Sequence, residues 1–347
     1  MFRVGQFTPQ LKLLFHTDRI QEWLKKGDCY PILIEVDPSN ACNHHCSFCS
    51  CGYLTDKSVL DKFVIGRNVP ILRDKGVRAI NWSGGGEPLV NKDFCDIAVW
   101  TVRRSIEQGL FTNGVLINED NVDVLLSTQS WIRVAIDAGT RETYKQLRGS
   151  DDFDKVIYNV KSLVEFKKKY GYNCQLGIGF VVTKENYKEI PLFADLIEKT
   201  GVDYGQYKPS ILVTKDEVRW WTDEVKNLLE EVFDRQIKAN INLYKLNDIT
   251  NNQFDHSYPI CYGHYFCPVI GADGEVYACS QLRGFKEFSF GNINRDNFDT
   301  IWKSKRRQKV IASIDVSNCP KFCKNNEINK ILYHIKHPDR KTHYNFL

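Results

Sequence analysis

The sequence predicts an α/β protein, namely a partial (β/α)6 TIM-like barrel followed by a small C-terminal domain made of a hairpin and a helix. Short, almost uniformly apolar runs alternate with amphipathic stretches of helical period over the first two thirds of the chain. Such runs are typical of parallel strands covered on both faces and joined by right-handed crossovers. Further along, Asp273-Gly274 stands between two apolar runs and predicts the hairpin.

Six strands are expected, and they leave the barrel open because eight are needed to close it. They cover 32–36, 79–83, 108–112, 132–137, 175–182 and 204–208. The helices expected between them cover 57–75, 93–106, 119–127, 153–170 and 186–200. Further helices are expected at 10–26, 220–240 and 298–313. An open, curved sheet of this kind leaves a wide mouth for a large substrate.

These elements divide the chain into three parts. Residues 1–30 form an N-terminal helical extension, 31–245 the partial barrel and 246–347 the C-terminal domain. The polar, loop-like stretch 247–257 marks the boundary between the last two parts.

Composition excludes several classes of protein. A hydrophobic fraction of 42% excludes a disordered chain, and no run approaches the 18 uncharged apolar residues of a membrane span. The N-terminus lacks the apolar core of a secretory signal, so the protein is expected in the cytoplasm. The net charge of +4 is too mild to indicate nucleic acid. The basic run 303–309 is expected to be a solvated helix face, since no aromatic platform accompanies it.

Cysteine is the outlier of the composition, with 12 residues in the chain. In a reducing compartment this number indicates metal or redox chemistry rather than disulfides. Cys29, Cys95 and Cys174 stand alone and are expected to be buried thiols. The others form two groups far apart in the sequence: Cys42, Cys46, Cys49 and Cys51, and Cys261, Cys267, Cys279, Cys319 and Cys323.

The first group follows the first expected strand, at the end of the barrel where active sites usually lie. Thiolates select zinc or iron–sulfur clusters, and a structural zinc site needs a fourth ligand. Cys42, Cys46 and Cys49, spaced x₃ and then x₂, instead suit a [4Fe–4S] cluster with one iron left open. The two intervening histidines are expected to be loop residues, and Cys51 a bystander.

These residues carry a resemblance. Cys-x₃-Cys-x₂-Cys with an aromatic residue, Phe48, before the last cysteine resembles the signature of the radical S-adenosylmethionine (radical SAM) superfamily. Ser-Gly-Gly-Gly-Glu-Pro at 83–88 resembles the Gly-Gly-Glu-Pro motif of that family. The resemblance assigns Gly85 and Gly86 to close approach of the backbone to the cofactor, and Glu87 to its ammonium.

Three further cofactor-binding residues are implied by the same resemblance. Asn113 and Asp137 follow the third and fourth strands, where family members contact the nucleoside. Asp137 serves either the ribose or the end of its strand. Arg148, in a run over 141–149 that also resembles the family, is implied to pair with the methionine carboxylate. Ala135 departs from the family pattern. Relatives often carry serine at this position, and the contact of that serine hydroxyl with the cofactor is lost here.

The resemblance implies a mechanism. The amine and carboxylate of S-adenosylmethionine chelate the open iron of the cluster, which passes one electron to the sulfonium. The carbon–sulfur bond breaks, and the resulting 5′-deoxyadenosyl radical takes a hydrogen atom from the substrate. A flavodoxin- or ferredoxin-type donor would supply the electron. The protein supplies placement and keeps solvent out.

The second group has the spacing Cys261-x₁₂-Gly274-x₄-Cys279, followed by Cys319-x₃-Cys323. The hairpin and the last helix bring these four thiolates together, and four can close a second, auxiliary [4Fe–4S] cluster. The pattern resembles the SPASM and twitch extensions of radical SAM enzymes. No cysteine follows Cys323, which favours the one-cluster twitch-like form. A structural zinc site is the alternative.

Cys267 is surplus to this pattern and leaves three interpretations. It is a buried strand thiol, or it replaces Cys261 as a ligand, or it returns a hydrogen atom to a substrate radical. The third interpretation would make the protein an epimerase. Lys208 and Tyr207, at the end of the sixth strand, are both expected to point to the barrel mouth.

The sequence therefore predicts a radical SAM oxidoreductase or epimerase. Only some 30 residues precede the first strand, which favours a small-molecule substrate (a sugar, aminocyclitol or nucleoside-like metabolite) over a peptide. Dehydrogenation or epimerisation of that metabolite is expected, with help from the auxiliary cluster. The alternatives are a peptide-modifying maturase and, outside enzymes, a zinc-bound structural or nucleic-acid-binding protein.

Overall fold

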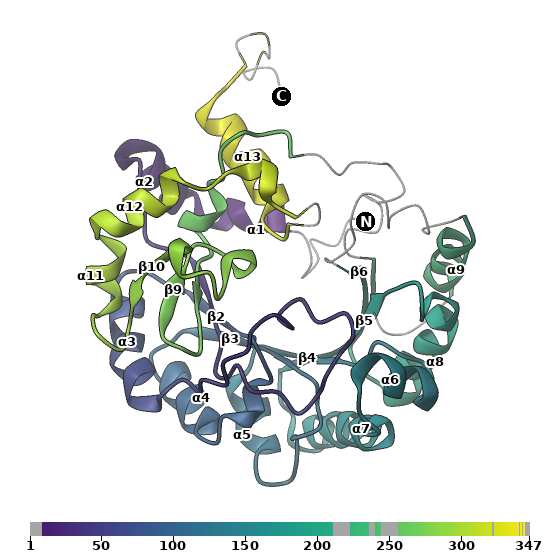
Figure 1. The fold of residues 1–347 in the computed structure, drawn as a ribbon. Helices are drawn as coiled ribbons and strands as arrows, with labels where there is room; N and C mark the ends of the chain where they lie inside the picture. Colours follow the sequence, from purple (N-terminus) through teal and green to yellow (C-terminus); the bar gives the residue numbers. More distant parts are fainter. Residues whose placement is uncertain are drawn as a thin grey trace.

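The computed structural model of the chain describes residues 9–210, 223–235, 240–243, 256–320, 323–339, 341 and 343. They form a curved, open sheet with helices on its outer side (Figure 1). The strand order is β10-β9-β8-β1-β2-β3-β4-β5-β6-β7. The predicted boundary at 247–257 lies outside the described residues, except for its last two.

All six predicted strands are confirmed, and neighbouring strands run parallel in sequence order. They are β1 (Leu33–Val36), β2 (Ala79–Trp82), β3 (Glu107–Thr112), β4 (Trp131–Ala135), β5 (Gln175–Val182) and β6 (Tyr204–Pro209). The sheet extends further than expected at both edges. β7 (Asn240–Leu243) runs parallel to β6, and β8 (Val269–Ile270) runs parallel to β1.

Helices follow these strands on the outer side. They are α3 (Lys62–Asp74), α4 (Phe94–Val102), α5 (Val122–Thr128), α6 (Arg141–Arg148), α7 (Phe153–Tyr170), α8 (Ile190–Thr200) and α9 (Asp223–Asp234). α6 was not expected. α3 begins five residues later than predicted, because Asp61 is its N-cap and accepts hydrogen bonds from the amides of Phe63 and Val64.

Two predicted helices are each divided in the structure. A 3-10 turn (Leu14–His16) separates α1 (Pro9–Leu13) from α2 (Thr17–Lys26). The helix predicted at 298–313 is in fact α11 (Phe298–Trp302) and α12 (Lys305–Ala312). The break falls at Ser304, whose hydroxyl accepts a hydrogen bond from the amide of Arg307 at 3.1 Å and so starts a new helix.

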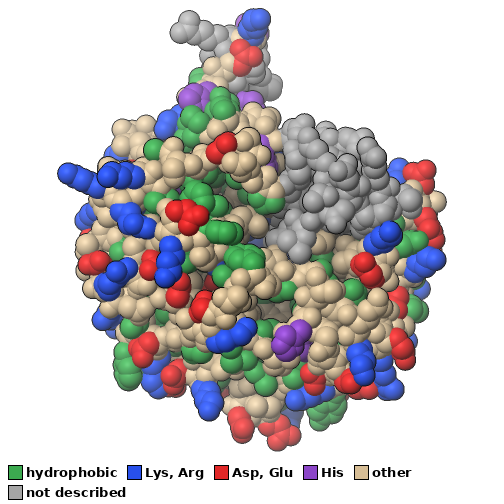
Figure 2. All heavy atoms as spheres, in the orientation of Figure 1, with side chains coloured by type: hydrophobic (Ala, Val, Ile, Leu, Met, Phe, Trp, Pro, Cys, Tyr) green, Lys and Arg blue, Asp and Glu red, His purple; other side chains and the backbone are tan. Residues whose placement is uncertain are grey.

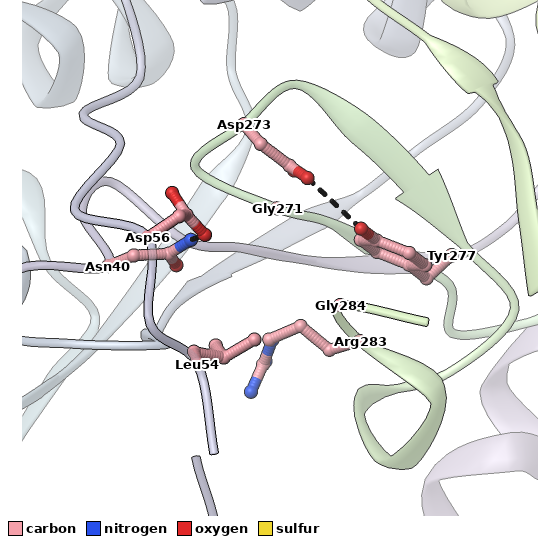
Figure 3. Close-up of a pocket in the computed structure, with 8 residues that line it drawn as sticks. All are labelled: Asn40, Leu54, Asp56, Gly271, Asp273, Tyr277, Arg283 and Gly284. Atoms are coloured by element: carbon pink, nitrogen blue, oxygen red, sulfur yellow. Dashed lines mark hydrogen bonds between the residues drawn. The ribbon is translucent and has the colours of Figure 1, made fainter. Parts of the chain in front are cut away.

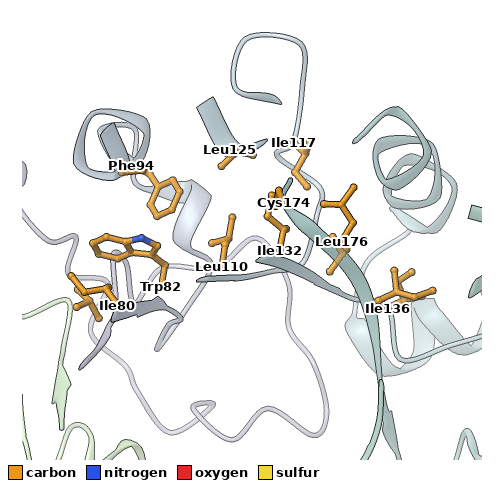
Figure 4. Close-up of a cluster of buried hydrophobic side chains, with 14 of the residues drawn as sticks. Ile80, Trp82, Phe94, Leu110, Ile117, Leu125, Ile132, Ile136, Cys174 and Leu176 are labelled. Atoms are coloured by element: carbon orange, nitrogen blue, oxygen red, sulfur yellow. The ribbon is translucent and has the colours of Figure 1, made fainter. Parts of the chain in front are cut away.

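The two faces of the sheet differ in exposure. Side chains that face the helices are fully buried, among them Ile80, Trp82, Leu110 and Ile132 (Figure 4). Side chains that face the inside of the barrel are often half-buried, as Trp131, Arg133 and Ala135 on β4 show. The inner face is therefore partly accessible, whereas the outer face is closed by packing.

The predicted hairpin is confirmed: β8 pairs with β9 (Glu275–Tyr277) around Gly274, whose φ of +80° is the left-handed backbone that glycine favours. β10 (Ser289–Asn292) continues this antiparallel ribbon. Because β8 also pairs with β1, the C-terminal part extends the barrel sheet directly.

α13 (Asn326–Lys336) lies against the N-terminal helices, where Leu332, Trp23 and Tyr262 share a separate apolar cluster. Two of the isolated cysteines, Cys29 and Cys174, are buried as expected, but Cys95 is only half-buried. Among the helices that the structure describes, none is both long and apolar enough to cross a bilayer.

Candidate active site

The first cysteine group lies on the loop after β1, across the carboxyl ends of the strands. Backbone hydrogen bonds fix this loop against the end of α6, from His45 N to Arg148 O (3.1 Å) and from Ser47 N to Leu147 O (2.9 Å). The thiols of Cys42 and Cys46 are half-buried and that of Cys49 is exposed. The group is thus open on one side, as a cluster with a free coordination position needs.

Arg148 sits beside this loop and is 6% exposed. Its Nη1 lies 3.3 Å from Cys46 Sγ and 3.3 Å from Asp137 Oδ2, and its Nη2 donates to the carbonyl of Ala135. Burial opposes its charge, but Asp137 and Cys46 raise the pKa of the Arg148 guanidinium. Arg148 therefore places a permanent positive charge next to a thiol of the first group.

Asp137 acts at the end of its strand. Its backbone is left-handed, with φ of +59°, and its Oδ1 accepts a hydrogen bond from Val181 N at 2.6 Å. The carboxylate is 1% exposed and its other oxygen faces Arg148. These contacts tie β4 to β5, which is the strand-end role considered for this residue, while its contact with a ribose stays a prediction.

The glycine-rich turn after β2 packs on the residues just before Cys42. A Cβ at Gly86 would lie 2.2 Å from the carbonyl oxygen of Ala41, and one at Gly85 would lie 2.2 Å from Asn40 Oδ1. Backbone bonds close the contact, from Gly86 N to Ser39 O and from Glu87 N to Ala41 O, each at 2.9 Å. These glycines let two backbone loops approach each other, so they position the cysteine loop.

Glu87 connects this turn to the end of β3. Its Oε1 accepts from Thr112 Oγ1 at 2.6 Å and from Leu89 N, and its Oε2 accepts from Asn113 N at 2.7 Å. The side-chain Nδ2 of Asn113 donates in turn to Oδ1 of Asn43, within the cysteine loop, at 2.7 Å. Burial raises the pKa of Glu87. Phe48 is half-buried on the same loop.

The thiols of the second group lie near one another. Burial, and after it the nearby thiol of Cys323, raises the pKa of Cys261, Cys279 and Cys319, to about 12 for Cys279 and Cys319. Cys261 Sγ also accepts a hydrogen bond from Asn329 Nδ2 on α13 at 3.4 Å. The hairpin, the segment at Cys319 and α13 thus surround one site of thiols.

The zinc alternative needs four donors about 2.3 Å from a single point. Within the described ranges, no three His, Cys, Asp or Glu side chains converge closely enough to hold one metal ion. A multi-iron cluster spreads its ligands over several irons and does not need them to converge on one point.

Cys267 lies between the second group and the inner face of the barrel. It is 5% exposed, and burial raises its pKa to about 11 although the neighbouring Lys324 opposes this. The ammonium of Lys324 also pairs with Oε1 of Glu35, an inward-facing residue of β1. Cys267, Lys324 and Glu35 thus form a polar chain from the auxiliary site to the barrel wall.

Arg283 links the two cysteine groups, and sequence reasoning missed it. Its Nε lies 2.5 Å from Asp37 Oδ2 at the end of β1, and its Nη1 donates to Cys51 Sγ at 3.0 Å. Burial raises the pKa of Asp37 to about 6, and Arg283 opposes the shift. Cys51, expected to be a bystander, thus has a partner. The available signal was Asp37 itself, since a carboxylate ending an apolar strand predicts a buried countercharge.

The expectation for Lys208 and Tyr207 is half wrong. Tyr207 is fully buried against Phe180 and Phe193, and its hydroxyl donates to the carbonyl of Ile190 at 2.8 Å, so it faces the helices. Neighbouring residues of a strand point to opposite faces, so only one of the two could face the interior. Lys208 is the inward one.

A small pocket lies between the first loop and the hairpin (Figure 3). Its lining comprises Asn40, Leu54, Asp56, Gly271, Asp273, Tyr277, Arg283 and Gly284. Its volume of about 10 Å³ is room for roughly one water. The Tyr277 hydroxyl donates to Asp273 Oδ2 at 3.0 Å beside it. This pocket is too small for an organic substrate.

An open barrel with three thiols at its mouth and four more at its sheet edge has the donor set of an iron–sulfur protein of the α/β class. Comparison with protein families agrees. Residues 36–197 match the radical SAM superfamily, and residues 261–325 match the SPASM iron–sulfur cluster-binding domain. The chain belongs to the radical SAM superfamily and carries a SPASM domain.

Relatives of this chain differ in their reactions. It is 27% identical over 177 residues to a probable GTP 3′,8-cyclase of Saccharolobus islandicus, a match that covers 49% of this chain and 54% of the relative. It is 25% identical to a tungsten-containing aldehyde ferredoxin oxidoreductase cofactor-modifying protein of Pyrococcus furiosus, covering 66% and 68%. The chain thus spans about half the length of the cyclases that it matches.

Solved structures share the fold. SuiB of Streptococcus suis, bound to S-adenosylmethionine, matches with a TM-score of 0.67 and 18% identity over 94% of this chain and 80% of SuiB. The enzyme anSMEcpe, also with S-adenosylmethionine bound, matches with a TM-score of 0.61 and 19% identity over 86% and 88%. At these identities the likeness establishes the fold.

The family defines the cofactors as S-adenosylmethionine and two iron–sulfur clusters. The residues present fit them. Three thiols form the open site, and Arg148 is their cationic neighbour. The buried Nε of Arg148 has no hydrogen-bond partner among the described residues. Four thiols form the second site. Cys42, Cys46 and Cys49 would hold the first cluster, and Cys261, Cys279, Cys319 and Cys323 the second.

Proposed function

We propose that this radical SAM enzyme is an oxidoreductase that removes hydrogen from a polar small molecule bound on the inner face of the barrel. One observation carries the proposal. The inner face between the two cysteine groups bears charged side chains from three strands: Glu35 on β1 and Asp37 just after it, Arg133 on β4 and Lys208 on β6. Glu35 and Asp37 already have ion-pair partners in Lys324 and Arg283, whereas the ammonium of Lys208 has none among the described residues, so a polar substrate that pairs with it is favoured.

When bound, S-adenosylmethionine and its cluster supply a hydrogen-abstracting group, and the auxiliary cluster supplies a site for a second electron. The residues of the chain position the sites of these two groups. The contacts of Glu87 and Arg148 fix the first loop over the carboxyl ends of the strands. The pair of Lys324 with Glu35 fixes the second site against the inner wall.

Dehydrogenation is the reaction that these residues favour. Four cysteines complete the coordination of a [4Fe–4S] cluster and leave no iron for the substrate, so the auxiliary site suits electron transfer. The polar chain from Cys267 through Lys324 to Glu35 connects that site with the inner wall. The net change in the substrate would be the loss of one hydrogen atom, one electron and one proton, which converts an alcohol to a ketone.

Epimerisation is the second candidate, and the position of Cys267 favours it. Its thiol lies beside Lys324 and near Glu35, at the wall of the barrel, and it is protonated at neutral pH because burial raises its pKa to about 11. A protonated thiol can return a hydrogen atom to a substrate radical. The structures of SuiB with the precursor peptide SuiA and of anSMEcpe with peptides make peptide modification a third outcome to test.

The test uses the anaerobically reconstituted holoenzyme with dithionite and S-adenosylmethionine. We expect release of 5′-deoxyadenosine, and transfer of deuterium into it from the correct labelled polar metabolite. A two-electron oxidised product that Cys267→Ala still forms supports dehydrogenation. Loss of product and of solvent deuterium uptake in that variant supports epimerisation. Absence of 5′-deoxyadenosine, or label transfer only from peptides, would refute the proposal.

A further inference from the structure

Lys208 is unlike the other charged residues of the inner wall. It lies near the carboxyl end of β6, half-buried on the inner face, and is paired in register with Val181 of β5. Among the residues that the structure describes, none forms a hydrogen bond or an ion pair with its ammonium. A half-buried lysine without a partner has lost hydration without compensation.

The charged groups around Lys208 are already engaged with one another. Those that act on it are Arg133, Asp137, Arg148 and Glu35. Asp137 is paired with Arg148 at 3.3 Å, and Glu35 is paired with Lys324. The two nearby carboxylates are therefore neutralised by other cations.

Arg133 adds further positive charge. Its guanidinium donates to Gln206 Oε1 and lies 4.3 Å from the centre of the Phe111 ring. Burial and the cations Arg133 and Arg148 together lower the pKa of Lys208 to about 8. At neutral pH most of this lysine is still protonated, and an added anion would relieve the excess of positive charge.

Small residues line the inner face just before the level of Lys208. Val181 of β5 is paired with Lys208 itself, and two residues earlier Gly179 is paired with Ala135 of β4 on one side and Gln206 of β6 on the other. The three atoms nearest to a Cβ at Gly179 all belong to the Arg133 side chain, the first at 3.6 Å. Ala135 and Gly179 thus add little side-chain bulk to the inner face between Arg133 and Lys208.

We propose that Lys208 anchors an anionic group of the substrate, a carboxylate or a phosphate, on the inner wall above Gly179. This inference rests on the proposed function and narrows its substrate class to anionic metabolites. An ammonium is a compact point charge and binds either anion without demanding a bidentate geometry. Arg133 contributes long-range attraction.

Binding without turnover provides the test. Inorganic phosphate and, separately, malonate are titrated calorimetrically into the reconstituted holoenzyme saturated with S-adenosylmethionine, as wild type, Lys208→Met, Lys208→Arg and Lys161→Met. Lys161 is an exposed lysine of α7 and serves as the matched control. Thermal unfolding of each variant verifies that it folds.

We expect saturable binding of at least one anion to the wild type. Lys208→Met should weaken it about tenfold or more, as expected for one lost charge-assisted contact, while Lys208→Arg and Lys161→Met stay within about threefold. The preferred anion then distinguishes phosphate from carboxylate. Absence of saturable binding to the wild type, or equal binding by Lys208→Met, would overturn the inference.

A third readout separates the substrate from the cofactor. The affinity for S-adenosylmethionine should be the same in Lys208→Met and wild type. A drop of about tenfold would place Lys208 at the cofactor carboxylate and overturn the inference, even if anion binding also fell. Failure of the proposed function gives a different result. In that case the wild type releases no 5′-deoxyadenosine, whether or not it binds anions.

Discussion

The two cysteine groups of this molecule are built in opposite ways. Cys42, Cys46 and Cys49 come from eight consecutive residues on one loop, and one of the three thiols is exposed. Cys261, Cys279, Cys319 and Cys323 come from segments up to 62 residues apart, and all four are half-buried, with Asn329 donating to Cys261. The first group is set by local spacing and the second by tertiary structure.

The difference teaches how each site depends on the rest of the fold. The local group keeps its spacing in any chain conformation, but its place over the barrel depends on the glycine turn, Glu87 and Arg148. The distant group exists only once β8, β9 and α13 are in place. Arg283 and Lys324 tie the second region to β1, so the two sites share one wall.

The largest expected effects are losses of iron and of cofactor cleavage, and they differ between the two cysteine groups. Cys46→Ala should lose about four irons per chain and abolish cleavage of S-adenosylmethionine, because the open cluster loses one of three ligands. Cys279→Ala should also lose about four irons but retain cleavage, since its cluster does not bind the cofactor. Iron analysis and 5′-deoxyadenosine measurement check this, with Cys95→Ala as a control that keeps both. Lost cleavage in a folded Cys279→Ala would mean that the two sites are not separable.

The next effect concerns the link between the regions. Arg283→Met leaves the buried carboxylate of Asp37 without its countercharge, which should cost about 3–5 kcal/mol of unfolding free energy. Arg295→Met is the control: its exposed pair with Glu275 at 3.6 Å is worth about 0–1 kcal/mol. Denaturant unfolding of the reconstituted proteins measures both. Asp37→Asn in the Arg283→Met background should recover part of the loss, and equal losses in the two arginine variants would contradict this account.

The stability of Arg283→Met relative to wild type should also depend on pH, in a direction set by Asp37. The pKa of Asp37 is raised to about 6 in the folded protein, above the value of about 3.9 in an unfolded chain. Between these values the folded state binds more protons, so stability falls as the pH rises. Arg283 opposes this rise, so Arg283→Met should raise the pKa of Asp37 further and regain stability relative to wild type as the pH falls from 7 towards 6. A difference that is constant over this range would exclude Asp37 as its source.

How far the sequence could predict this molecule follows from the same contrast. The strands and the spacing of Cys42, Cys46 and Cys49 are local patterns, and the structure confirms the strands. Convergence of the second group could be inferred only because Asp273-Gly274 marks a hairpin. α6 was missed because its eight residues, with three buried, give too short a pattern to separate from a loop.

Contacts between distant segments were beyond the sequence. Nothing local to Arg283 indicates that it meets Asp37 and Cys51, which are 246 and 232 residues away. Gly85 and Gly86 were assigned to the cofactor, which stays a prediction, and the sequence did not indicate that they also lie against Asn40 and Ala41. The assignment of Tyr207 to the interior ignored the two-residue period of its strand.

A smaller effect sharpens the account of how the first loop is held. Gly86→Ala would put a Cβ 2.2 Å from the Ala41 carbonyl oxygen, so the loop that leads to Cys42 must move. We expect a loss of about 2–4 kcal/mol and weaker binding of S-adenosylmethionine, while the iron of the second site stays. Gly171→Ala is the control, because a Cβ there meets nothing within 4 Å and costs only about 1–2 kcal/mol of left-handed backbone strain. Unchanged cofactor binding in Gly86→Ala would show that the turn does not position the loop.

The smallest effect decides whether the second group has four members or five. Cys267 lies beside Lys324, the residue that follows Cys323 in the sequence. The thiol of Cys267, however, is directed to the Lys324–Glu35 pair. Cys267→Ala should therefore keep the full iron content and lose only about 1 kcal/mol, as expected for a buried thiol that makes one polar contact. Cys261→Ala, by contrast, should lose the iron of the second site. The two variants are compared by iron analysis and by the electron paramagnetic resonance of the reduced clusters. If Cys267→Ala loses iron while Cys261→Ala keeps it, the ligand is Cys267, and the hydrogen-returning role considered for its thiol is excluded because a cluster-bound sulfur carries no hydrogen atom to give.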